Sequence, residues 1–68
     1  MKDTYAERIY QLRKENKLSQ ADLAKSIGVT QKAIDFWEKS INEPKATYIV
    51  KLAEFFNVTC GYILGTED

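Results

Sequence analysis

The segment from Ser19 to Glu38, SQADLAKSIGVTQKAIDFWE, constrains the fold more than any other part of the chain. Ser19 is a residue type that caps the first turn of a helix. Asp22 stands three positions later, where an acid can return a hydrogen bond to the capping residue. Gly28 follows the apolar Ile27 directly, at the position where helices commonly end in a left-handed residue. The pattern therefore predicts a short helix that begins after Ser19 and ends at Gly28.

A second short helix is predicted after a turn of about three residues. Thr30 is a second candidate cap, and Ile34 and Trp37 follow at a spacing of three, which places both on one helical face. Two capped helices of about eight to ten residues, joined by a short turn that contains a glycine, have the form of a helix-turn-helix motif. The second helix of that motif enters the major groove of DNA.

Apolar residues at helical spacing predict three more helices around this pair. The expected helices cover about residues 3 or 4 to 15, 20–27, 31–39, 45–56 and 59–64. In the first helix Arg8 is expected to face outward, and in the last helix Leu64 is expected to face inward. Residues 66–68 are expected to fray. The predicted fold is all-α, a compact five-helix bundle that forms one domain over residues 1–68.

The composition weighs against several classes of function. The chain contains no histidine and one cysteine, Cys60. Neither a metal-ligand cluster nor an internal disulfide is expected, and no histidine is available as a catalytic base. We therefore expect no metal, no cofactor and no enzyme activity. The apolar runs are far shorter than the ~20 residues of a membrane helix, and the N-terminus lacks the apolar core of a signal peptide, so a cytoplasmic location is expected.

The longer segment LSQADLAKSIGVTQKAIDFWEKSINEP resembles the signature of the Cro/C1-type phage repressor family, also called the Xre family. The shared features are Leu-Ser-Gln before the first helix of the motif, Leu-Ala at its centre, Gly-Val-Thr at the turn, Ile and then Trp-Glu in the second helix, and a proline after a short loop. The resemblance covers about residues 6–64. It implies a lambda repressor-like DNA-binding domain, with the helix-turn-helix at about residues 20–39.

The function that this resemblance implies is transcriptional regulation. It implies a bacterial or phage repressor that binds double-stranded DNA sequence-specifically, as a homodimer, with the third helix in the major groove. In the family, a glutamine that starts the second helix contacts a phosphate and supports a glutamine that starts the third; Gln20 and Gln31 match these positions. Arg13 and Glu38 match a pair that forms a buried, structural ion pair. Asn42 lies in the loop that clamps the DNA backbone.

The chemistry of individual side chains extends the set of candidate DNA contacts. The Gln31 amide can pair with adenine, and Lys32 is unfavourable for the helix dipole in the first turn, which points to a phosphate or guanine partner. Ala33 can meet a thymine methyl, Asp35 can accept from a cytosine amine, and Phe36 can pack on sugar or methyl groups. The base-contact candidates are Gln31, Lys32, Ala33, Asp35 and Phe36. The phosphate-contact candidates are Gln20, Thr30, Lys39, Asn42 and Lys45.

The overall charge argues against DNA binding. Ten basic and ten acidic residues give a formal net charge of zero, whereas DNA-binding domains are usually basic. Affinity for phosphate depends on the charge of the docking face, so neutrality does not exclude the function. Phe36 beside Asp35 would equally suit a protein-contact surface, and simple solvation is an alternative for Asp35. The alternative function is a protein-interaction module that kept the helix-turn-helix fold with weak or no DNA binding.

A homodimer is expected because one recognition helix covers too few base pairs to select a site in a genome. The contact is expected near the C-terminal end of the bundle, where several apolar side chains are predicted to be exposed. These candidates are Ile41, Tyr48, Phe55 and Tyr62.

Overall fold

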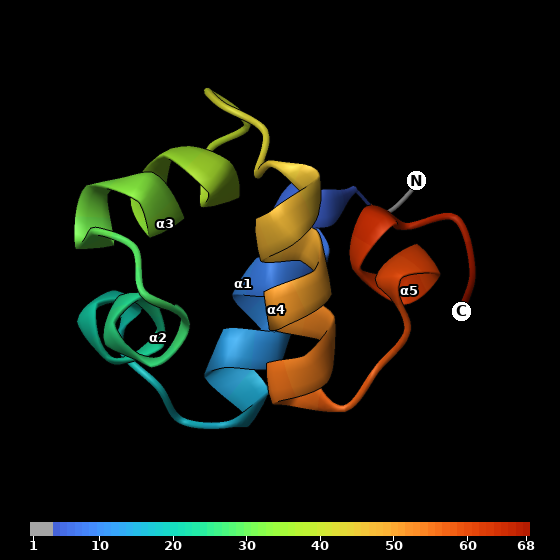
Figure 1. Cartoon of the computed structure of the whole chain (residues 1–68), viewed down its shortest axis with the longest axis horizontal. Coiled ribbons are helices and arrows are strands. Elements are labelled where there is room, and N and C mark those ends of the chain that lie inside the picture. Colours follow the sequence, from blue (N-terminus) through green and yellow to red (C-terminus); the bar gives the residue numbers. More distant parts are fainter. Residues whose placement is uncertain (1–3) are drawn as a thin grey trace.

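Five helices make up the part of the chain described by the computed structural model, residues 4–68 (Figure 1). They are α1 (Tyr5–Glu15), α2 (Gln20–Ile27), α3 (Gln31–Glu38), α4 (Ala46–Phe56) and α5 (Cys60–Leu64). The predicted all-α, five-helix fold is confirmed, and only the helix ends differ, by a residue or so. A start of α1 at Asp3 lies outside the described residues. None of the helices within residues 4–68 combines the length and the apolar character that a membrane-spanning helix requires.

Side-chain caps determine where α2 and α3 begin. Ser19 Oγ accepts a hydrogen bond from the Asp22 backbone N–H at 3.0 Å, and the Asp22 carboxylate accepts one from the Ser19 N–H at 3.2 Å. This second bond is the main cause that lowers the pKa of Asp22. Thr30 Oγ1 accepts from the backbone of Ala33 at 3.1 Å. Gly28 ends α2 with a φ of 80°, which a glycine adopts without steric cost. The predicted capped helices and their tight turn are therefore present.

One apolar cluster holds the five helices together. Each helix contributes one of the largest fully buried side chains, which are Ile9, Leu23, Ile34, Leu52 and Ile63. Trp37 on α3 is also buried, and its ring lies 5.8 Å from that of Tyr48 on α4. In Figure 1, α1 and α4 occupy the centre of the bundle, with α2 and α3 on one side and α5 on the other. This arrangement holds the α2–α3 pair by its inner faces and leaves its outer surface accessible.

Two predictions about side-chain direction are wrong. Arg8 is buried, and its Nη1 donates to the carbonyl oxygens of Tyr62 and Glu67, both at 3.0 Å. The guanidinium carbon also lies 4.1 Å from the centroid of the Tyr62 ring. The long arginine stem can cross apolar surface, and the charge is satisfied by acceptors that are distant in the sequence. Leu64, expected to be internal, is 48% exposed at the end of the short helix α5.

Residues 66–68, which were expected to fray, follow α5 and make hydrogen bonds to other parts of the chain. The Thr66 N–H donates to the Gly61 carbonyl at 2.9 Å, and Thr59 Oγ1 bonds the Glu67 carboxylate at 2.5 Å. Arg8 of α1 adds its bond to the Glu67 carbonyl. These contacts fold the segment after α5 back onto α5 and α1.

Candidate nucleic-acid interface

The starts of α2 and α3 bring four candidate residues together. Gln31 and Lys32 are exposed in the first turn of α3. Together with Gln20 and Asp35 they line one shallow, open depression on the outer surface of the α2–α3 pair. The glutamines and the lysine supply hydrogen-bond donors, and the glutamines and the aspartate supply acceptors. This surface therefore offers the mixed donor and acceptor chemistry that matches base edges and phosphates.

Gln20 is bonded to α3 by two acidic side chains. Its Nε2 donates to Glu38 Oε1 at 3.0 Å and to Asp35 Oδ1 at 3.3 Å. Within residues 4–68, no hydrogen bond joins Gln20 to Gln31. The first residue of α2 is therefore fixed against α3 through both protons of one amide group.

Asp35 receives a second donor from Lys39. Lys39 Nζ lies 3.0 Å from Asp35 Oδ2, and the two side chains are 60% and 30% exposed respectively. The hydrogen bond from Lys39, followed by that from Gln20, holds the pKa of Asp35 below its usual range. The negative charge of Asp35 thus lies near the exposed start of α3. It binds Lys39 and Gln20, which are both candidates for phosphate contact.

Arg13 and Glu38 join α1 to α3 in the ion pair that the family resemblance implies. Arg13 Nε lies 2.7 Å from Glu38 Oε2, and Nη2 donates to Oε1 at 3.0 Å. The arginine side chain is 10% exposed and the glutamate side chain 6%. Arg13 Nη1 also donates to the Leu18 carbonyl at 2.9 Å. The bond to Glu38 is the main cause that raises the pKa of Arg13. Through these bonds Arg13 holds both α3 and the residues just before α2 against α1.

The remaining base-contact candidates are less accessible than the start of α3. Ala33 is half-buried and packs against the apolar cluster. Phe36 is also half-buried, and Lys32 Nζ lies 5.7 Å from the centroid of its ring. Such a cation–π contact at an exposed site contributes ~0.5–1 kcal/mol. The pair places an ammonium group beside an aromatic ring on α3.

The loop between α3 and α4 is anchored to α3 and to α1. The Ile41 N–H donates to the Phe36 carbonyl at 2.9 Å, and the Tyr5 hydroxyl donates to the Asn42 carbonyl at 3.1 Å. No sequence pattern indicated this role of Tyr5, because its partner lies in a distant loop. Lys45 is exposed just before α4 and makes no side-chain cap. Thr30, Asn42 and Lys45 are all accessible to a ligand.

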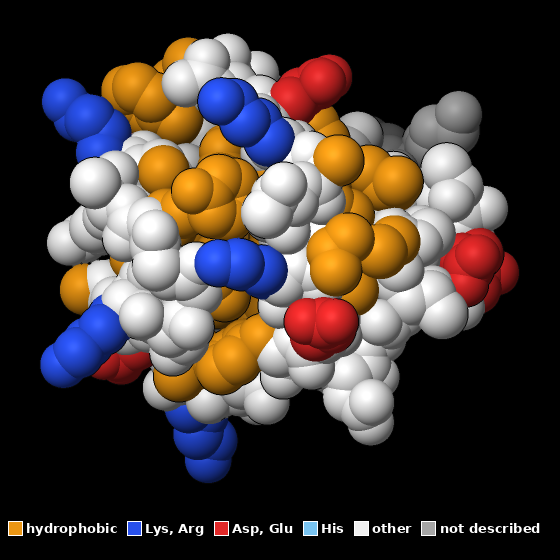
Figure 2. Space-filling model, in the orientation of Figure 1, with side chains coloured by type: hydrophobic (Ala, Val, Ile, Leu, Met, Phe, Trp, Pro, Cys, Tyr) orange, Lys and Arg blue, Asp and Glu red, His pale blue; other side chains and the backbone are white. Residues whose placement is uncertain are grey.

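Basic side chains are unevenly distributed despite the zero net charge. On the face drawn in Figure 2, lysine and arginine side chains lie over the half that contains α2 and α3 and over α4, whereas acidic side chains are scattered from α2 and the α3–α4 loop to α4 and the C-terminus. Within residues 4–68, no group of histidine, cysteine or acidic residues is arranged to hold a metal ion. Residues 19–39, which form the helix pair, contain three basic and three acidic residues, so exposure of the lysines rather than net charge distinguishes this surface.

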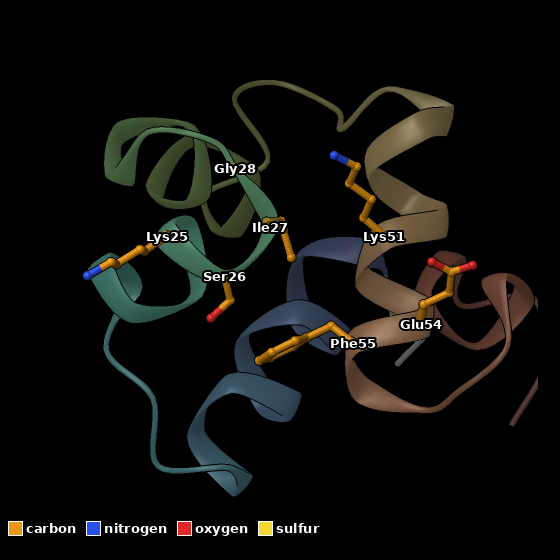
Figure 3. A pocket seen from close by; sticks show the side chains of 7 residues that line it. All are labelled: Lys25, Ser26, Ile27, Gly28, Lys51, Glu54 and Phe55. Atoms are coloured by element: carbon orange, nitrogen blue, oxygen red, sulfur yellow. The ribbon is translucent and has the colours of Figure 1, made fainter.

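A second open hollow lies between the end of α2 and α4 (Figure 3). None of the residues proposed for DNA contact lines it. Phe55 extends toward the gap, whereas Glu54 points away from α2. The lining residues are Lys25, Ser26, Ile27, Gly28, Lys51, Glu54 and Phe55. This hollow is therefore separate from the depression at the starts of α2 and α3.

Two capped helices joined through a left-handed glycine, and packed on a third helix through a buried ion pair, define a helix-turn-helix domain. Residues 9–63 match the family model described as helix-turn-helix. The chain belongs to this family, and the predicted resemblance to Cro/C1-type repressors is confirmed.

Two relatives and one solved structure illustrate the similarity. The chain is 36% identical over 64 residues to YobD, an uncharacterised helix-turn-helix-type transcriptional regulator of Bacillus subtilis (strain 168); the match covers 94% of this chain and 57% of YobD. It is 38% identical over 58 residues to repressor protein C2 of Salmonella phage P22, covering 85% of this chain and 27% of the repressor. The chain therefore spans only part of the length of both relatives.

The solved structure is the P22 c2 repressor in complex with a synthetic operator. It superposes with a TM-score of 0.89 at 34% identity, over 96% of this chain and 98% of the repressor chain in that crystal. The likeness therefore extends through all five helices and includes the loop between α3 and α4.

Proposed function

We propose that this chain is a DNA-binding unit of a transcriptional repressor, which places α3 in the major groove of double-stranded DNA. The observation that carries the proposal is the accessible start of α3, where Gln31 and Lys32 stand beside Gln20 of α2. Membership of the helix-turn-helix family and the likeness to a repressor solved with an operator support it. The relatives do not favour the alternative of a protein-interaction module, because they are described as regulators or repressors.

In this proposal the two helices have different tasks. Gln31 and Lys32 contact base edges, and Ala33 and Phe36 offer apolar contact to thymine methyl or sugar groups. The phosphate contacts position the domain on the duplex without reading sequence. They come from Gln20, Thr30, Lys39, Asn42 and Lys45. We expect no catalysis, cofactor or metal for this task, and we place the protein in the cytoplasm.

Replacing Gln31 with alanine is expected to relax sequence preference at one base pair, because the amide can make a bidentate contact to adenine worth ~1–3 kcal/mol of discrimination. The preferred duplex is first selected from a random pool with the unaltered protein. Affinities of both proteins are then compared across all single-base variants of that duplex.

The matched control for this experiment is Gln11→Ala, which removes an exposed glutamine from α1. It is expected to leave the preference unchanged. An undiminished preference in the Gln31 variant would exclude Gln31 as a base contact. A folded, unaltered protein that selects no sequence would contradict the proposed function itself.

We also propose that two copies bind one operator. Of the expected contact residues, Tyr48 and Tyr62 are half-buried against Trp37 and Arg8, which makes them poor candidates. An apolar groove between α4 and α5 is a better candidate for the contact between the two copies, because two of its side chains, Val50 and Leu64, are 45% and 48% exposed. The groove is lined by Pro44, Ala46, Ile49, Val50, Cys60 and Leu64.

Sedimentation of the protein with its selected duplex is expected to show two chains per DNA, on half-sites centred about 34 Å apart. Leu64→Glu is expected to give one chain per duplex and weaker binding, because a charge in the groove opposes burial of apolar surface. Tyr10→Glu, at an exposed side chain of α1 outside the groove, serves as the control. Two chains per duplex with Leu64→Glu, or one with the unaltered protein, would rule out this contact.

A further inference from the structure

We propose that Asp35 restrains DNA binding by competing with DNA phosphates for Lys39 and Gln20. The inference rests on the proposed function, and it gives Asp35 a role other than contact with a base. Lys39 Nζ lies 3.0 Å from Asp35 Oδ2, and Gln20 Nε2 lies 3.3 Å from Asp35 Oδ1. Both partners belong to the set proposed to contact phosphate. Both direct a donor at a carboxylate of α3.

Carboxylate and phosphate oxygens accept the same charge-assisted hydrogen bonds. Each oxygen of Asp35 already receives one donor from the chain, so a cytosine amine would have to share or displace these bonds. Lys39 must exchange Asp35 for a phosphate in order to contact the duplex. Its side chain is 60% exposed, and ion pairs this accessible are weak enough to be exchanged. Asp35 therefore weakens phosphate contact without preventing it.

Competition for phosphate contacts weakens binding to every DNA sequence, whereas base contacts strengthen binding only to the preferred sequence. A duplex that lacks the preferred bases must displace Asp35 from Lys39 and Gln20 without forming base contacts in return. The preferred duplex adds the contacts of Gln31 and Lys32 at the same surface. Asp35 thus lowers the affinity for every duplex by a similar factor, and the base contacts alone distinguish the preferred duplex from the others.

The second acid on α3 has a different role. Glu38 also accepts a bond from Gln20, at 3.0 Å, but its charge is paired with Arg13 inside the bundle. Asparagine at position 35 would keep an oxygen that can accept from Gln20, and it would replace the charged oxygen that holds Lys39 with an amide nitrogen that cannot accept from Lys39. Asp35→Asn therefore separates the competition from the structural network.

Asp35→Asn is expected to bind both random and preferred duplexes about two- to fivefold more tightly at low salt. The slope of log affinity against log salt is expected to steepen by about one per chain, because Lys39 becomes free to displace a counterion. Titration of labelled duplexes at several salt concentrations measures both quantities. Weaker binding to the preferred duplex, with a changed base preference, would show instead that Asp35 contacts a base and would overturn the inference.

Two further variants distinguish local competition from a general change of charge. Glu54→Gln makes the same charge change on α4, where Glu54 points away from α2 (Figure 3), and is expected to leave the slope unchanged. Lys39→Ala is expected to weaken binding little in the unaltered chain and about two- to fivefold more in the Asp35→Asn background. Equal losses in both backgrounds would overturn the inference. Failure of the folded, unaltered chain to bind any duplex would overturn the proposed function as well.

Discussion

Replacing Glu38 with alanine is expected to lower the free energy of unfolding by about 3–5 kcal/mol, because it leaves the buried charge of Arg13 without its carboxylate. The same change removes the nearer acceptor of Gln20, at 3.0 Å. A chain of this length has a total stability of roughly 3–10 kcal/mol, so the loss would take a large fraction of it. Urea unfolding followed by circular dichroism measures the difference.

Glu54→Ala is the control for this experiment, since it removes an exposed glutamate and is expected to change stability by less than about 0.5 kcal/mol. Replacing both members of the pair, Arg13 by methionine and Glu38 by leucine, is expected to recover most of the loss because no buried charge remains. If the single Glu38 variant were as stable as the control, the ion pair could not be what fixes α3 on α1.

Affinity for the preferred duplex is expected to fall about a hundredfold when salt is raised from about 50 to about 200 mM. Lys32 and Lys45 belong to the proposed DNA-contact set and make no ion pair within residues 4–68, whereas Lys39 is engaged by Asp35. Two chains thus bring about four available lysines to the duplex. Lys32, although it reaches base edges, lies between the phosphates of the groove and also neutralises phosphate charge. At a slope of about −0.9 for each neutralised phosphate, the total slope is therefore about −3.6.

The test is a series of titrations of the unaltered protein and of Lys45→Ala. The variant is expected to weaken binding to every sequence by a similar factor and to reduce the slope by about one per chain. Lys51→Ala, a lysine of the second hollow on α4, is the matched control. A flat salt response in the unaltered protein would contradict phosphate binding and would favour the protein-interaction alternative.

Local features of the fold were predictable because their partners lie close in the sequence. The capping box of Ser19 and Asp22 joins residues three positions apart, and the left-handed end of α2 depends on Gly28 alone. Apolar spacing likewise predicts one buried face in each helix. The Arg13–Glu38 pair joins residues 25 positions apart, and it was predicted only through the resemblance to a family.

Contacts between distant polar residues were not predictable in this way. The Tyr5 hydroxyl meets a carbonyl 37 positions away, and no periodic pattern connects the two. At the candidate interface, the resemblance linked Gln20 to Gln31, whereas the structure bonds Gln20 to Asp35 and Glu38. These acids are three positions apart on α3 and so lie on the edge that faces the start of α2. Which polar partner is within reach depends on how the helices pack.

The bonds of Arg8 also determine when the chain can finish folding in the cell. The ribosome adds Arg8 54 residues before Tyr62 and 59 residues before Glu67, the two residues whose carbonyls it bonds. The buried Ile63 that α5 contributes to the core is made equally late. While synthesis is still short of these residues, α1 lacks both acceptors and part of its apolar cover. Folding of this bundle is therefore completed only after the segment that follows α5 has left the ribosomal tunnel.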